Sequence, residues 1–135
     1  MTKVKIVCLA SFLAVSVAQA STPCDGFEIK IKNALSDSLV ATKTQLNGAS
    51  IQPAGIQKID GNSEAVFTVN GSDANIPMTG HFTFRTISLP SKVVRIRFHL
   101  TNQVLVCEHS EDTSDGDFSI SNTRVPGKIT YTISN

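Results

Sequence analysis

Two alternating segments separated by a polar loop constrain the fold of this chain more than any other part of the sequence. Phe67 and Val69 alternate with Val66, Thr68 and Asn70, and Phe82 and Phe84 alternate with His81, Thr83 and Arg85. Side chains two apart in a strand lie on the same face, so each segment should place one face on a core. Residues 70–79 between them are rich in Asn, Gly, Ser, Asp and Pro, which favour turns. The sequence therefore predicts two strands joined by a loop that carries neither a nucleophile–base pair nor a metal cluster.

Similar short runs follow one another along the chain, with Gly, Pro, Asn and Ser between them. We expect strands at residues 27–32, 39–46, 56–59, 65–69, 80–87, 93–100, 103–108, 118–121 and 128–133. Residues 33–40 fit a helical turn less well than a loop because of Ser36, Asp37 and Ser38. Short strands with regular turn signals are typical of sandwiches and barrels. We predict an all-β, single-domain antiparallel β-sandwich of about nine strands.

Residues 1–20 have the parts of a secretory signal peptide. A basic start with Lys3 and Lys5 precedes an apolar run at residues 6–17, and Ala18-Gln19-Ala20 forms a small-residue cleavage site. A single membrane anchor is the alternative, but the apolar run is shorter than the ~20 residues that a spanning helix needs. Cys8 lacks the context of a lipoprotein signal. We expect cleavage near Ala20, a domain over residues 21–135, and a secreted or periplasmic, soluble product of bacterial type.

Loss of the signal also changes the charge and the number of cysteines. Removing Lys3 and Lys5 takes the formal net charge from +1 to −1, a balance that does not favour nucleic acid as a partner. Cys24 and Cys107 remain, and an oxidising compartment favours a disulfide between them. This bridge would be worth about 4 kcal/mol in the chain-entropy model. A catalytic thiol is the alternative, but the sequence offers no matching His–Asn pattern.

Residues 80–87 and 93–100 are spaced as a hairpin, which would gather basic side chains on its outer face. These candidates for binding lipid phosphate or another anion are His81, Arg85, Arg95, Arg97 and His99. Arginine forks match phosphate and carboxylate geometry. The alternative, which the sequence favours, is a solvated face with cross-strand charge pairs to Glu28 or Glu108.

The remaining polar clusters do not indicate catalysis or a cofactor. Residues 108–117 are acidic, and Asp112, Asp115 and Asp117 could supply calcium ligands, but their spacing is not that of an EF-hand. We interpret the segment as an acidic surface loop. The three histidines lack zinc-site spacing, and no hydrolase motif is present. We therefore expect no metal, no cofactor and no enzymatic activity.

Several short motifs follow one another along the chain. The longest combines Ser72-Asp73-Ala74 with Gly80 and Phe82, and the others are Ile29, Ile31, Asn33, Leu46, Gly48, the run Lys92-Val93-Val94-Arg95, and Gly127, Ile129 and Thr130. In this order they resemble motifs of the aegerolysins, a family of small β-sandwich proteins that bind membrane lipids, and the longest resembles the family's SDA…G-x-F block. Phe98-His99-Leu100-Thr101-Asn102 stands where the family has a tryptophan-rich stretch, and this chain contains no Trp.

Together these patterns predict a secreted, non-enzymatic binding protein that acts at membrane lipid surfaces, of the toxin or virulence-factor type. In this interpretation the arginine face meets lipid phosphate, and the loop with Asn70, Ser72 and Asp73 shapes selectivity. The alternative is an exported protein-binding or structural module of the envelope, because exposed strand edges can accept a partner strand.

Overall fold

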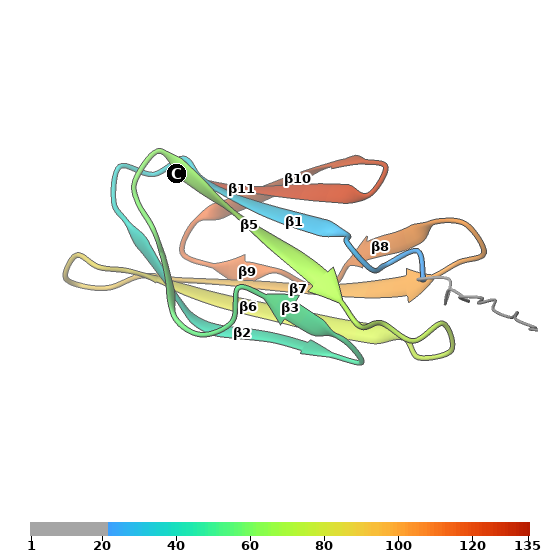
Figure 1. Cartoon of the computed structure of the whole chain (residues 1–135). Coiled ribbons are helices and arrows are strands. Elements are labelled where there is room, and N and C mark those ends of the chain that lie inside the picture. The colour runs from blue at the N-terminus through green and yellow to red at the C-terminus, as the bar shows by residue number, and fades with distance from the viewer. Residues whose placement is uncertain (1–21) are drawn as a thin grey trace, which may run out of the picture.

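The computed structural model describes residues 22–135 as two packed β-sheets (Figure 1). The predicted signal peptide and Cys8 lie outside the described residues. Eleven strands follow in order: β1 (Glu28–Asn33), β2 (Leu39–Asn47), β3 (Ser50–Gln52), β4 (Gln57–Ile59), β5 (Ser63–Asn70), β6 (Met78–Thr86), β7 (Val93–Asn102), β8 (Cys107–Glu111), β9 (Asp115–Gly116), β10 (Ser119–Val125) and β11 (Lys128–Ser134). None of the residues described forms a helix long and apolar enough to cross a membrane.

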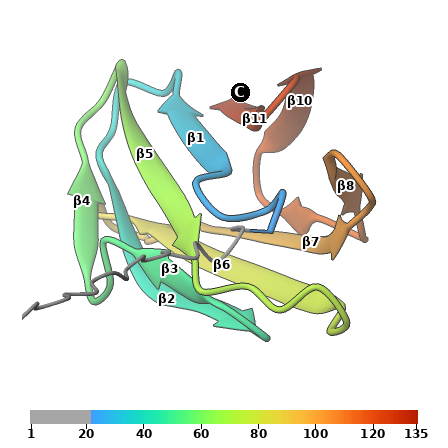
Figure 2. The same ribbon diagram turned by 45° about the vertical axis from the view of Figure 1, so that its right-hand side comes forward.

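The first sheet has the order β10-β11-β1-β5-β3, and the second has the order β4-β2-β6-β7-β8, with β9 also paired to β7. All pairs are antiparallel except β1 and β11, which are parallel, with Ile29 opposite Ile129 and Ile31 opposite Tyr131. The expected β-sandwich is confirmed, and this one parallel pair brings the last strand beside the first. Figure 2 shows the two sheets facing each other, with β8 opposite β10 and β11 along one open side.

The core lies between the sheets and follows the predicted alternation. Phe67, Phe82, Phe84 and Phe98 are fully buried, and the Phe67 and Phe82 ring centroids are 4.9 Å apart. Gly80 faces the same core, because the Phe98 ring lies over it and a Cβ there would sit 2.1 Å from the ring. The alternation therefore identified which face of β5, β6 and β7 is buried.

Three strand predictions need correction. Ser50–Gln52 and Asp115–Gly116 are additional strands, too short for alternation to reveal them. The predicted strand at 103–108 is wrong: residues 103–106 form a turn closed by a hydrogen bond from the Gln103 N–H to the Val106 carbonyl at 2.9 Å, and β8 begins at Cys107. The three apolar residues Val104, Leu105 and Val106 have the composition of a buried strand, but they are exposed.

Several loops meet at one end of the sandwich, on the right in Figure 1. Cys24 is bonded to Cys107 there, and the Gly26 N–H donates to the Val69 carbonyl. We call it the disulfide end. The loop at residues 87–92 between β6 and β7 lies at the opposite end, where the Ile87 N–H donates to the Ser38 carbonyl.

Candidate binding surfaces

The basic candidates lie on the outer face of β6 and β7, as the hairpin spacing suggested. Cross-strand register places His81 opposite Arg97 and Thr83 opposite Arg95. His99 lies further toward the disulfide end, opposite Thr79, whereas Arg85 lies at the other end, opposite Val93. The structure thus brings His81, Arg95 and Arg97 together and leaves Arg85 and His99 at the two margins of the face.

The acidic segment folds back onto this basic face. Asp115 lies 3.6 Å from Arg95 and 3.8 Å from Arg97, and the Arg97 guanidinium also donates to the Thr113 carbonyl at 2.7 Å. His99 lies 3.5 Å from Asp112. The charge partners come from residues 112–115, not from Glu28 or Glu108.

Local electrostatics on this face follow from the same arrangement. Burial first, and then the positive charge of Lys43, lower the pKa of His81.

The acidic segment does not form a metal site. Asp117 accepts the Val93 N–H at 2.8 Å, whereas Asp115 faces Arg95 and Arg97. No three metal-ligating side chains gather anywhere in residues 22–135. Asp112, Asp115 and Asp117 bind to β7 instead of surrounding a shared point.

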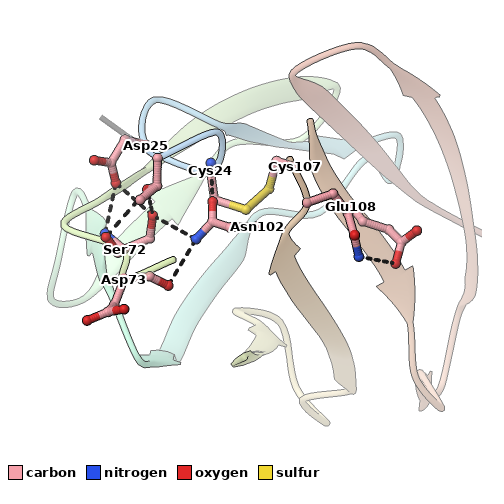
Figure 3. Close-up of a disulfide and its surroundings, with 9 residues drawn as sticks. Cys24, Asp25, Ser72, Asp73, Asn102, Cys107 and Glu108 are labelled. Carbon is pink, nitrogen blue, oxygen red and sulfur yellow. Dashed lines mark hydrogen bonds between the residues drawn. A yellow bond between two sulfur atoms is a disulfide. The ribbon is translucent and has the colours of Figure 1, made fainter. Parts of the chain in front are cut away.

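The loop candidates are anchored to the start of the described chain. Asp25 accepts hydrogen bonds from the Ser72 N–H at 2.8 Å and from its hydroxyl at 2.9 Å (Figure 3). The backbone bond from Ser72 is the main reason that the pKa of Asp25 is lowered. Asp73 caps its own turn by accepting the Asn75 N–H at 2.8 Å, and Asn70 ends β5 at an exposed position. The bonds between Asp25 and Ser72 and the turn capped by Asp73 fix the loop.

Asn102 and the disulfide tie three segments together at this end (Figure 3). The side-chain NH₂ group of Asn102 donates to the Asp73 carbonyl at 3.1 Å, and the side-chain oxygen of Asn102 accepts the Cys24 N–H at 2.7 Å. The predicted bridge between Cys24 and Cys107 is present and closes 83 residues. It is consistent with an extracellular or periplasmic location.

An apolar turn projects beside this anchored base. Val104, Leu105 and Val106 are 91%, 86% and 60% exposed, and we call them the apolar tip. They occupy the turn between β7 and β8, immediately before the bridged Cys107. The sequence signal was available, since three consecutive apolar residues break strand alternation.

A pocket of about 180 Å³ opens between β8 and the β10–β11 turn. We call it the His109 pocket, and its lining residues are Phe27, Cys107, Glu108, His109, Arg124, Val125 and Lys128. These residues come from distant parts of the chain, so no local motif could have indicated it.

His109 is the most unusual group in this pocket, because it is a histidine only 5% exposed. Its Nε2 lies 2.6 Å from the Tyr131 hydroxyl, and its Nδ1 is buried with no hydrogen-bond partner within residues 22–135. Burial, and then the positive charge of Arg124, lower the pKa of His109 to about 4. Its imidazole is therefore neutral near pH 7.

Comparison with models of known protein families finds no match for this sequence, and comparison with curated proteins finds none either.

Proposed function

We propose that this protein is a non-enzymatic binding protein that attaches to membrane lipid surfaces through the apolar tip. The observation that carries the proposal is the exposure of three consecutive aliphatic side chains, Val104, Leu105 and Val106, at the end of a hairpin. Contiguous exposed apolar residues commonly mark a surface that contacts lipid or another protein.

The apolar tip can supply enough free energy for weak attachment to a membrane. Complete burial of a Val or Leu side chain contributes about 1.5–3 kcal/mol, so the three side chains together give roughly 5 kcal/mol on entering lipid. A gain of this size supports weak, reversible attachment, as a single acyl chain does. Stable attachment therefore calls for a second contact with the polar part of the membrane.

The tip is also held in position before it meets any ligand. The bond from Gln103 to Val106 closes the turn, and Asn102 and Cys107 fix its two ends. A preorganised turn loses little conformational freedom on binding. The resemblance to the aegerolysins supports the same ligand class. The apolar tip follows residues 98–102, which stand where the family has its tryptophan-rich stretch.

A second candidate function is strand addition by a protein partner. β10 ends the order of its sheet and spans seven residues, so one of its edges has no neighbouring strand within residues 22–135. Free edges accept extended peptides through backbone hydrogen bonds. Binding of this kind would not depend on lipid or on the apolar tip.

Vesicle flotation separates these functions. Leu105→Glu places a charge at the centre of the tip and should reduce binding to phosphatidylcholine vesicles at least tenfold. Leu89→Glu is the matched control, because Leu89 is a 92% exposed leucine in the loop at the opposite end, and it should bind as the unchanged protein does. Equal loss in both variants, or no vesicle binding by the unchanged protein, would contradict the proposed function.

A further inference from the structure

The His109 pocket carries an excess of positive charge. Arg124 and Lys128 line it, and neither forms an ion pair within the described part of the chain. Glu108 is the one carboxylate in its lining, and that side chain accepts a hydrogen bond from the exposed Gln103 amide at 3.5 Å. Two cations and one carboxylate favour an anionic ligand.

Arg124 is positioned to present its guanidinium toward the pocket. Arg124 lies on the same face of β10 as Ile120 and Asn122. Ile120 packs against the core, and Asn122 donates to Glu111 of β8 across the gap between the sheets, so this face points toward the second sheet. The charge of Arg124 also acts on the neighbouring His109, and the charges of Glu111 and Arg124 both act on Tyr131. A guanidinium fork can bind two oxygens of a phosphate at once.

His109 supplies a buried donor at the same place. The Tyr131 hydroxyl can donate one hydrogen bond. Its contact with His109 Nε2 is the only side-chain hydrogen bond of that hydroxyl within residues 22–135. If the hydroxyl donates to Nε2, Nδ1 carries the ring proton and one donor stays unpaired. The opposite tautomer would leave both the phenol proton and the Nδ1 lone pair unpaired. Because unpaired buried groups are costly, the first arrangement is favoured, and Nδ1–H is a donor with no hydrogen-bond acceptor among the residues that the structure describes.

We propose that the His109 pocket is a binding site for a phosphate group, held by the Arg124 guanidinium and the His109 Nδ1–H with support from Lys128. Its volume of about 180 Å³ is below the range of about 300–1,000 Å³ usual for drug-sized ligands. The size suits inorganic phosphate or the phosphate of a lipid headgroup.

The position of the pocket relates it to the apolar tip. Cys107 lines the pocket and directly follows Val106, and Val125 lines it and is 54% exposed. The pocket therefore opens beside the surface that we assign to the membrane. Binding of a headgroup phosphate rests on the proposed function, whereas binding of free phosphate does not.

Titration of the oxidised protein with inorganic phosphate at pH 7 tests the site by calorimetry and by ¹⁵N spectra of the histidine rings. We expect saturable binding with a shift of the His109 Nδ1 signal. Arg124→Gln should weaken this binding at least tenfold, and Lys58→Gln, at an exposed position of β4 outside the pocket lining, should leave it unchanged. No shift at His109, or equal binding by the Arg124→Gln variant, would overturn the proposal.

Vesicles then identify the source of the phosphate. If the site takes headgroups, phosphatidic acid added to phosphatidylcholine vesicles should strengthen flotation in the unchanged protein but not in Arg124→Gln, and free phosphate should compete. Phosphate binding without this lipid effect supports a site for the free anion. If Leu105→Glu loses flotation but still binds phosphate, both proposals are supported. If the unchanged protein binds phosphate but does not float with vesicles, the proposed function is rejected and the phosphate site is not.

Discussion

Gly80 and Phe98 show at the scale of single residues how tightly this core is filled. Gly80 is the inward-facing residue of β6 that lies beneath an aromatic ring, with space for hydrogen but not for a methyl group. The same glycine belongs to the short block that resembles the aegerolysins. Its physical role here is to leave room for the end of the Phe98 ring between β6 and β7.

Replacing Gly80 by Ala should therefore destabilise the protein. The new Cβ would be 2.1 Å from the Phe98 ring, and overpacking of this kind costs about 1–3 kcal/mol. The loss of flexibility in the unfolded chain offsets only about 0.4–1 kcal/mol. Urea unfolding should show a lower midpoint for Gly80→Ala and little change for the exposed neighbour Thr79→Ala, and equal midpoints would contradict the packing described.

His109 should make stability depend on pH. Its pKa falls from the ordinary 6.5 to about 4 in the folded protein, so the unfolded chain binds a proton at pH values where the folded chain does not. Stability is then complete above about pH 6.5 and decreases as the pH falls toward 4, by up to about 3 kcal/mol. Urea unfolding between pH 7 and pH 4 measures this loss. It should be much smaller in His109→Gln, and an unchanged loss would place its origin elsewhere.

At the scale of elements, β7 connects most of the features described above. It pairs with β6, β8 and β9, and its outer face carries Arg95 and Arg97, which the acidic segment covers in part. It ends in Asn102, the residue that ties the start of the described chain to the β5–β6 loop. The basic face on β6 and β7 and the apolar tip between β7 and β8 thus share one strand, β7, but they can be tested separately.

Arg95 and Arg97 should matter less for vesicle binding than Leu105. Asp115 lies within 4 Å of both and neutralises part of their charge. Exposed ion pairs of this kind contribute only about 0–1 kcal/mol to stability, so removing them should leave the fold intact. The paired change Arg95→Gln plus Arg97→Gln should therefore retain most flotation. If it abolished flotation while Leu105→Glu did not, the lipid site would belong on the outer face of β6 and β7.

The bridge between Cys24 and Cys107 should be a main source of stability. It closes 83 residues, for which the chain-entropy model gives about 4 kcal/mol. Cys24→Ala plus Cys107→Ala should lower the free energy of unfolding by about this amount in urea. A change below about 1 kcal/mol would show that residual structure restricts the unfolded chain without the bridge about as strongly as the bridge does.

For the whole molecule, sequence reasoning succeeded where periodicity and packing agree. Alternation in β1, β5, β6 and β7 predicted the buried faces and the β-sandwich, and two cysteines predicted the disulfide. It failed at residues 103–106, because apolar residues predict a strand only if something covers them. It also missed the His109 pocket, whose walls come from β8, β10 and β11 and the residue before β1. Proximity of that kind depends on topology, and the parallel pairing of β1 and β11 is not visible in any single segment.

The absence of tryptophan from the sequence makes the orientation of the whole molecule on a membrane directly measurable. Leu105→Trp and Leu89→Trp each introduce a single indole, one at the apolar tip and one at the opposite end. With phosphatidylcholine vesicles, the emission of Leu105→Trp should shift to the blue and be quenched by brominated acyl chains, while that of Leu89→Trp should stay unchanged. Quenching at position 89 without quenching at position 105 would contradict attachment through the apolar tip.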